Sequence, residues 1–229
     1  MALIQVEHLS KTYDATAVPV HALRDVNVIF ERGEFTAIVG PSGSGKTTFL
    51  NMLGGLDKPT DGRILIDGKN LLDLSGSALT EYRLHHIGFV FQAYNLIPVF
   101  SALENVEFIM LLQGKEKKER RQRARELLEA VGLGDRLHAR PAQLSGGQQQ
   151  RVAVARALAS RPEFVLADEP TANLDSHAAD ALLTLMENLN SQYNMTFIFS
   201  THDARVIQRA HRVITLHDGA VERDEIIQK

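Results

Sequence analysis

Cysteine is absent from this sequence of 229 residues. Disulfide bonds, thiolate catalysis and sulfur-ligated metal sites are therefore excluded, and the absence fits a protein of the cytosol. Long apolar runs are also missing, because the longest uninterrupted run extends only from Phe108 to Leu112. A membrane-spanning helix needs about 20 such residues, so we expect a chain that does not cross a bilayer by itself.

Two further absences concern targeting and charge. The N-terminal segment lacks a basic stretch followed by a long apolar one, so we expect no secretory signal. The net charge of −3 argues against a general nucleic-acid-binding surface, and no nucleic-acid partner is expected. Hydrophobic residues make up 44% of the sequence and charged residues 23%, as in ordinary globular proteins. Without repeats, low-complexity tracts or long linkers, the sequence predicts a single domain over residues 1–229.

The first third predicts an antiparallel sheet and the start of an α/β core. Residues 3–6 and 26–30 are rich in β-branched and apolar side chains, which favours extended structure. An apolar strand at 35–39 then leads through a glycine-rich loop into a helix at 47–53, and a further strand is predicted at 63–68.

The middle third is predicted to be helical. Ser101 and Glu104 have the spacing of a capping box ahead of the apolar segment 106–112. Helical spacing further along predicts one buried face, made by Ala124, Leu127, Leu128 and Val131. Between these segments, residues 115–125 carry seven basic and two acidic side chains. We interpret this run as a solvated helix face, with contact with anionic lipid headgroups as the alternative.

The last third returns to α/β alternation. Nearly continuous apolar runs at 164–167 and 196–199 are typical of parallel strands covered on both faces, and a helix is predicted between them at 180–189. Another strand at 213–216 ends at a turn formed by Asp218 and Gly219. The elements together predict an α/β fold with a mixed, mainly parallel sheet, an antiparallel β subdomain, and an α-helical subdomain over approximately residues 93–160.

The glycine-rich loop after the strand at 35–39 matches the phosphate-binding pattern G-x-x-x-x-G-K-[ST]. Its residues are Gly40, Pro41, Ser42, Gly43, Ser44, Gly45, Lys46 and Thr47. Glycines let backbone N–H groups curl around phosphate oxygens, and the following helix adds the positive end of its dipole. Lys46 is expected to reach the β- and γ-phosphates, Thr47 to bind Mg²⁺ and Thr48 to contact the α-phosphate. The loop predicts a nucleotide site on a P-loop NTPase core, and the sequence lacks the guanine-reading N-K-x-D motif of GTPases.

The segment LSGGQ at 144–148 precedes a helix predicted at 149–159. Ser145 and Gln148 have capping-box spacing, which accounts for the ends of the string. Gly146 and Gly147 in a first helical turn each cost up to about 1 kcal/mol relative to alanine. Bare backbone there requires a reason, and a phosphate at the helix N-terminus is the natural candidate.

Two adjacent carboxylates, Asp168 and Glu169, follow the apolar strand at 164–167. Parallel strands deliver the residues at their C-terminal ends to the ligand-binding edge of the sheet, and Asp168 stands at such an end. Asp168 is expected to hold Mg²⁺, mostly through water, as in other P-loop NTPases. Glu169 is the candidate base that polarises the attacking water.

With these motifs in this order, nearly the whole sequence resembles the ATP-binding cassette (ABC) ATPases. The resemblance implies ATP hydrolysis with Mg²⁺ in a head-to-tail homodimer. In that family the LSGGQ string contacts nucleotide on the opposite subunit, which implies action in trans for Ser145, Gly146, Gly147, Gln148 and the linking-loop residue Asp175. The resemblance further implies that Gln92 senses Mg²⁺ and the membrane partner, that His202 contacts the γ-phosphate and positions Glu169, and that Tyr13 stacks on adenine.

Residues 88–98 and 101–106 resemble one branch in particular, the lipoprotein-releasing and macrolide-export ATPases and the related cell-division ATPase. The branch usually has glycine where this sequence has Ala172. The resemblance implies a peripheral subunit on the cytoplasmic side of the inner membrane that powers integral membrane permease subunits. Lipoprotein release or export of lipophilic compounds or peptides is the favoured role, and mechanical signalling without transport is the alternative. The resemblance also places a docking groove for a helix of the membrane subunit beside Gln92, where we predict Tyr94 and Leu96 to line it. A soluble DNA-repair ATPase is disfavoured, because neither a coiled-coil nor a zinc-bearing insertion is visible.

Overall fold

The computed structural model describes residues 2–14 and 19–227. Its main sheet contains, in spatial order, β10 (Ala220–Ile226), β9 (Arg212–His217), β3 (Phe35–Val39), β8 (Thr196–Ser200), β7 (Phe164–Asp168) and β6 (Ile87–Val90). The strands from β9 to β6 are parallel, and β10 pairs antiparallel with β9. The mixed, mainly parallel sheet predicted from the sequence is confirmed.

The second sheet is the antiparallel β subdomain. In spatial order it contains β2 (Val20–Glu31), β1 (Ala2–Tyr13), β4 (Asp61–Ile66) and the short β5 (Lys69–Asn70). Alternation along β2 buries Val26, Val28 and Phe30 while their neighbours are exposed, as expected for a sheet with one face in the core. The predicted antiparallel subdomain is therefore confirmed. The predicted strands at 3–6 and 26–30 lie within it, and the strand predicted at 63–68 corresponds to β4, which ends earlier, at Ile66.

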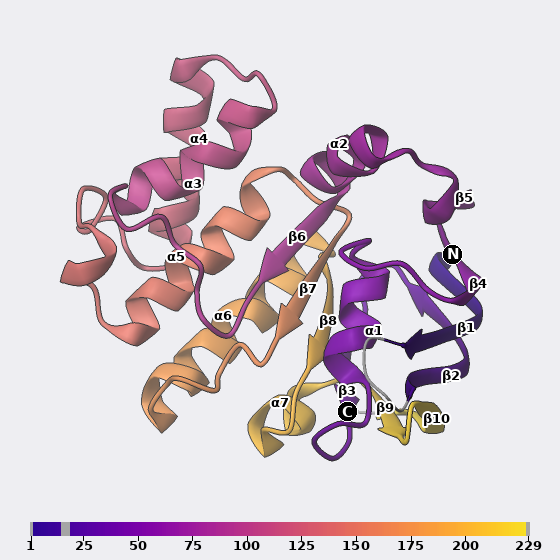
Figure 1. The fold of residues 1–229 in the computed structure, drawn as a ribbon. Helices are drawn as coiled ribbons and strands as arrows, with labels where there is room; N and C mark the ends of the chain where they lie inside the picture. The colour runs from indigo at the N-terminus through magenta and orange to yellow at the C-terminus, as the bar shows by residue number, and fades with distance from the viewer. Residues whose placement is uncertain (1, 15–18, 228–229) are drawn as a thin grey trace.

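Helices pack on both faces of the main sheet (Figure 1). They are α1 (Lys46–Leu53), α2 (Gly76–His86), α3 (Ala102–Leu112), α4 (Lys117–Ala130), α5 (Gly146–Ala159), α6 (Ser176–Tyr193) and α7 (Ala204–Arg209), with 3₁₀ turns at Leu71–Asp73 and Pro141–Gln143. α3, α4 and α5 pack against one another and form the predicted helical subdomain. The capping box of Ser101 and Glu104 begins α3 as predicted.

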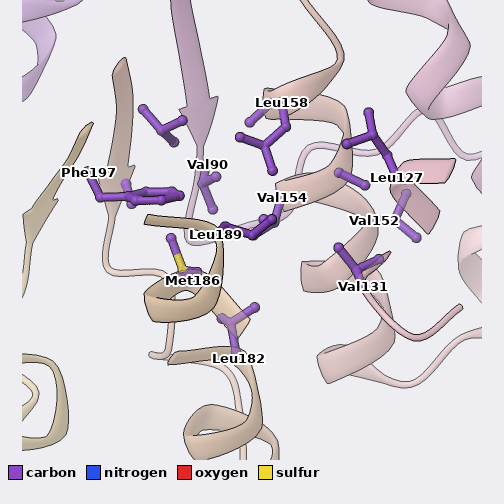
Figure 2. Packing of buried hydrophobic residues seen from close by; sticks show 14 of the residues in the cluster. Val90, Leu127, Val131, Val152, Val154, Leu158, Leu182, Met186, Leu189 and Phe197 are labelled. Carbon is purple, nitrogen blue, oxygen red and sulfur yellow. The ribbon is translucent and has the colours of Figure 1, made fainter. Parts of the chain in front are cut away.

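The core lies in two clusters, one on each face of the main sheet. In β7, Phe164 and Leu166 belong to the cluster shared with α1 and the antiparallel sheet, whereas Val165 and Ala167 belong to the cluster under α5 and α6. Figure 2 shows the second cluster, where side chains of α6 and α5 meet Phe197 of β8. Successive residues of a strand point to opposite faces of the sheet, and both faces are covered here. The apolar residues of β7 and β8 are therefore all buried.

The basic run at 115–125 lies mainly on the outer surface of α4. Ala124, Leu127 and Leu128 form the buried face that the spacing predicted, and most of the charged side chains of the run are exposed. Contact of the run with lipid stays a hypothesis. Within the described part of the chain, none of the helices combines the length and apolarity needed to span a membrane.

The site is positioned by the C-terminal ends of the parallel strands, which share one edge of the sheet. β3 ends at Val39 directly before the phosphate loop, and β7 ends at Asp168, which lies opposite Ser200 at the end of β8. β6 ends at Val90, two residues before Gln92. Segments far apart in the sequence therefore deliver polar side chains to one place.

Candidate nucleotide-binding site

The phosphate loop turns sharply between β3 and α1. Gly45 precedes α1 with a φ of 99°, and a Cβ there would lie 2.3 Å from the backbone oxygen of Ala22. Gly43 also has a positive φ, of 82°, but a Cβ there would meet no atom within 4 Å. The loop thus packs tightly against the antiparallel sheet at Gly45 and leaves its outer turn at Gly43 open to a ligand.

A cavity of about 710 Å³ opens over this loop. Its lining brings together residues of the loop, of α1, of β1 and β2, and of the segments that follow β6, β7 and β8. The lining residues are Tyr13, Val20, His21, Ala22, Gly40, Pro41, Ser42, Gly43, Gly45, Lys46, Thr47, Thr48, Gln92, Glu169 and His202. Of the predicted phosphate-loop residues, Ser44 is buried and does not line the cavity, and its hydroxyl has no hydrogen-bond partner among the described residues.

Thr47 and Asp168 meet at the base of the cavity. The Thr47 hydroxyl donates a hydrogen bond of 3.2 Å to Asp168 Oδ1. Burial raises the pKa of the Asp168 carboxyl, while the hydrogen bond from Thr47 acts in the opposite direction. A hydroxyl and a carboxylate oxygen side by side beside a phosphate loop fit Mg²⁺, which usually binds one or two carboxylates together with substrate phosphates.

Glu169 and His202 form a pair on the cavity wall. His202 Nδ1 lies 2.7 Å from Glu169 Oε1, and the Thr201 hydroxyl donates to Glu169 Oε2 at 3.3 Å. The Glu169 backbone is left-handed, with a φ of 45°, and its N–H donates to the Ser200 oxygen at 2.9 Å. Such a conformation costs a non-glycine residue about 1–3 kcal/mol and is retained where surrounding contacts fix it. The glutamate is therefore held in one orientation by Ser200 at the end of β8 and by Thr201 and His202 in the loop after it.

Lys46 reaches back over its own loop. Its Nζ donates hydrogen bonds of 2.9 and 3.1 Å to the backbone oxygens of Gly40 and Pro41. This places the ammonium group at the start of the phosphate loop, on the lining of the cavity, where it is able to exchange backbone partners for phosphate oxygens.

The LSGGQ string caps α5 and lies outside this cavity. Ser145 accepts a hydrogen bond from the Gln148 N–H at 3.3 Å, and the Gln148 side chain accepts one from the Ser145 N–H at 3.0 Å. α5 begins at Gly146, earlier than the predicted start at 149, so both glycines belong to the helix. A Cβ at Gly146 would lie 2.8 Å from the Tyr94 hydroxyl, and one at Gly147 would lie 2.9 Å from the Cβ of Ala178. Close packing against the Ala178 Cβ therefore gives Gly147 a reason within the chain for bare backbone, whereas at Gly146 the end of the Tyr94 side chain is able to shift.

Comparison with known proteins identifies the family that carries this combination of loop, carboxylates and capped helix. Residues 23–172 match the ABC transporter family. This chain belongs to the ABC transporter ATPases. An ABC transporter ATP-binding protein of Methanocaldococcus jannaschii is 46% identical over 97% of both chains. A solved dimeric structure of that cassette in a post-hydrolysis state, bound to ADP and phosphate, covers 99% of both chains with a TM-score of 0.91 and 44% identity.

The relatives also identify the branch within the ABC ATPases. The lipoprotein-releasing system ATP-binding protein LolD of Idiomarina loihiensis is 43% identical over 98% of both chains. The macrolide export ATP-binding/permease protein MacB of a Shewanella strain is 46% identical over 98% of this chain, which spans 34% of that longer protein. The predicted membership of the lipoprotein-releasing and macrolide-export branch is confirmed.

In this ABC ATPase, a second and largely apolar cavity of about 410 Å³ lies between α2, β6, α3 and α5. We call it the α3–α5 groove. Its lining includes Phe91, Ile97, Phe108 and Ile109, but not Tyr94 or Leu96. The two side chains do not line this cavity, and the prediction that they help to form a docking groove beside Gln92 stays a prediction.

Tyr94 and Leu96 are turned away from the groove by the backbone of the loop. Tyr94 and Asn95 are both left-handed, with φ values of 58° and 49°, and the Arg156 guanidinium donates to the backbone oxygens of both. Leu96 packs against the core, and the Tyr94 side chain lies beside Gly146. Arg156 was not predicted to belong to this region, because nothing in the sequence pairs it with a loop some 60 positions earlier.

α5 connects the LSGGQ string to the α3–α5 groove. Its first residues, Gly146 and Gly147, belong to the string, while Arg156 and Ala157 near its other end line the groove. The same helix therefore touches both regions of the molecule.

The loop that carries His202 is held by an acid that the sequence analysis also missed. Asp203 accepts a hydrogen bond of 2.7 Å from the Thr171 hydroxyl, forms an ion pair with Arg205 and begins α7. Hydrogen bonding to Arg205 lowers the pKa of Asp203 to about 2, so the carboxylate is charged at all ordinary pH values. Its position next to His202 was the available signal.

The segment after Glu169 contacts the segment that follows β6 and begins α6. The Asn173 side chain donates a hydrogen bond of 2.9 Å to the backbone oxygen of Gln92, and Asp175 accepts from the Ala178 N–H at 2.8 Å to begin α6. Gln92 and the predicted linking loop at 172–175 are thus in direct contact, although Asp175 itself does not line the cavity.

Proposed function

We propose that this ABC ATPase hydrolyses MgATP between two copies of itself and thereby powers separate integral membrane permease subunits, in lipoprotein release or export of lipophilic compounds or peptides. The observation that carries the proposal is the single cavity that unites the phosphate loop, the Glu169–His202 pair and Gln92 without any residue of the LSGGQ string. A second copy is the natural source of the missing donor groups. Resemblance to LolD and MacB supports the cargo class.

In the proposed mechanism the chain binds the triphosphate through the phosphate loop and Lys46, with Thr48 at the α-phosphate. Thr47 and Asp168 would hold Mg²⁺, with Gln92 close to it, and the ion would neutralise charge on the β- and γ-phosphates. Glu169 accepts a proton from the attacking water, since its carboxylate is held by His202 and Thr201 at the cavity wall. His202 is exposed and keeps its other ring nitrogen available for the γ-phosphate.

Across the proposed homodimer, Ser145, Gly146, Gly147 and Gln148 supply the N-terminus of α5 to the partner's γ-phosphate, where backbone N–H groups and the helix dipole favour an anion. Asp175 lies at the start of α6 and is proposed to contact the opposite site. We retain residues 93–160 as the helical subdomain, a boundary supported by the mutual packing of α3, α4 and α5.

Dimerisation gives the first test. Glu169→Gln with saturating MgATP should elute at twice the monomer mass in size-exclusion chromatography with light scattering, because unhydrolysed nucleotide holds the two copies together. The same variant with ADP is the control and should elute as a monomer. A monomer mass with ATP, both for the free chain and in the presence of its membrane partner, contradicts the sandwiched dimer.

The membrane partner gives the second test. We propose that the α3–α5 groove receives an apolar cytoplasmic segment of the permease, since Phe91, Ile97 and Phe108 offer apolar surface to a groove. Ile97→Asp should abolish co-isolation with the permease while leaving the basal ATPase rate of the free chain within about twofold, because the change is outside the nucleotide cavity. Val99→Asp is the matched control, because Val99 is 69% exposed and does not line the groove. Equal co-isolation of both variants would refute the docking site.

A further inference from the structure

The proposed base-stacking residue, Tyr13, is held on two sides by side chains with no assigned role. Its hydroxyl donates a hydrogen bond of 2.8 Å to Asp57 Oδ2. The ammonium group of Lys11 lies over the ring, 4.7 Å from the ring centroid. Since the cation occupies one face of the ring, only the opposite face is free to stack on a base.

Lys11 and Asp57 are also bound to each other. Lys11 Nζ lies 2.9 Å from Asp57 Oδ1 and donates a second bond of 2.6 Å to the backbone oxygen of Lys58. The Lys11 side chain is only 13% exposed and that of Asp57 33%, so the pair is partly sheltered from solvent. Burial alone raises the pKa of Asp57, but hydrogen bonds from Lys11 and Tyr13 outweigh burial and lower it, which keeps the carboxylate charged. The three side chains therefore form one closed arrangement, the Lys11–Asp57 clamp on Tyr13.

The clamp is attached to the helix that carries the phosphate-loop residues. α1 begins at Lys46, and the backbone that follows its last turn is bonded back to the helix, because the N–H groups of Leu56 and Asp57 donate to the Asn51 oxygen at 2.8 and 3.4 Å. Lys46 and Thr47 thus lie at one end of α1 and Asp57 just beyond the other. Tyr13 is the last residue of β1, in the antiparallel sheet, and is tied through Asp57 to the unit formed by α1 and the phosphate loop.

We propose that Lys11 and Asp57 are positioning residues for the nucleotide base, which fix the ring of Tyr13 relative to the phosphate loop so that base and triphosphate are bound by one rigid unit. The inference rests on the proposed stacking role of Tyr13. It predicts that the clamp contributes to binding of a nucleotide but not to binding of a triphosphate that lacks a base.

The test compares affinities for a non-hydrolysable ATP analogue and for inorganic tripolyphosphate, both with Mg²⁺, in the full chain. Asp57→Ala and Tyr13→Phe should each lower the affinity for the analogue by about threefold to tenfold, the range expected for losing an ordered aromatic contact. Tripolyphosphate affinity should be unchanged in both. Because Asp57 acts through the Tyr13 hydroxyl, the double variant should bind the analogue no more weakly than Asp57→Ala alone. Lys11→Met should likewise lower the affinity for the analogue and leave the affinity for tripolyphosphate unchanged.

Two controls separate the possible failures. Asp61→Ala, at the first residue of β4, removes a carboxylate whose bond is to the neighbouring Gly62 N–H, and it should leave both affinities unchanged. Tyr13→Ala tests stacking itself: if it leaves the analogue affinity unchanged, the proposed role of Tyr13 fails. If Tyr13→Ala weakens the analogue but Asp57→Ala does not, the clamp alone fails. Two results would overturn the positioning role. One is an equal loss of affinity for the analogue and for tripolyphosphate in Asp57→Ala. The other is a double variant whose loss of affinity for the analogue equals the product of the two single losses.

Discussion

Glu169→Gln is expected to lower the steady-state rate of ATP hydrolysis by at least about 100-fold, the contribution typical of a positioned general base. Glutamine keeps the shape of the side chain, and its amide oxygen and NH₂ group are each able to pair with one of the two neighbours, His202 and Thr201, whose atoms lie 2.7 and 3.3 Å from the two glutamate oxygens. The neutral amide of glutamine, unlike a carboxylate, is too weak a base to accept a proton from water. The left-handed backbone at residue 169 is set by main-chain contacts and should be retained.

The measurement is the steady-state release of phosphate alongside ATP affinity. Affinity should change little, because the triphosphate is bound by the phosphate loop and Lys46. Glu163→Gln is a matched control, since Glu163 is a carboxylate paired with His86 at the opposite end of β7, and its hydrolysis rate should be close to that of the wild type. A Glu169→Gln turnover near that of the wild type would falsify the assignment of the base.

Lys46→Ala is expected to weaken ATP binding by about 10- to 100-fold, the value of one or two hydrogen bonds to a charged group. The ammonium group now donates to the oxygens of Gly40 and Pro41 at 2.9 and 3.1 Å, on the lining of the cavity. Its loss removes the cation that the β- and γ-phosphates would otherwise approach. Hydrolysis at low ATP concentration should fall with the affinity.

Equilibrium binding of a fluorescent ATP analogue measures this effect. Lys69→Ala is the control, because Lys69 is an exposed lysine of β5 far from the cavity lining and carries the same charge. Wild-type affinity in Lys46→Ala, or an equal loss in Lys69→Ala, would show that the ammonium group does not contact the triphosphate.

The sequence was informative where a local pattern determines the structure. The strand ends that deliver Asp168 and the phosphate loop follow from apolar runs whose boundaries are visible in the chain, and the capping boxes at Ser101 and Ser145 follow from residue spacing. The alternation of β7 between two core layers confirms the prediction of a strand covered on both faces.

The sequence was uninformative where contacts join distant segments. The orientation of Tyr94 and Leu96 depends on two consecutive left-handed residues whose carbonyl groups are bound by Arg156. Asparagine at 95 is compatible with that conformation, but tyrosine at 94 gives no signal for it. The bond between Tyr13 and Asp57 likewise joins residues 44 positions apart. The glycines of LSGGQ were correctly singled out, but a packing reason for Gly147 required the position of Ala178.

The connection made by α5 has a kinetic consequence. An α-helix rises about 1.5 Å per residue and does not shorten under modest load, so its two ends move together. If the LSGGQ end leaves the partner's phosphate after hydrolysis, the Arg156 end must shift within the groove in the same step. Release of phosphate and relaxation of the permease would then cross one barrier, and rapid-mixing experiments on the assembled transporter should give the same rate constant for both.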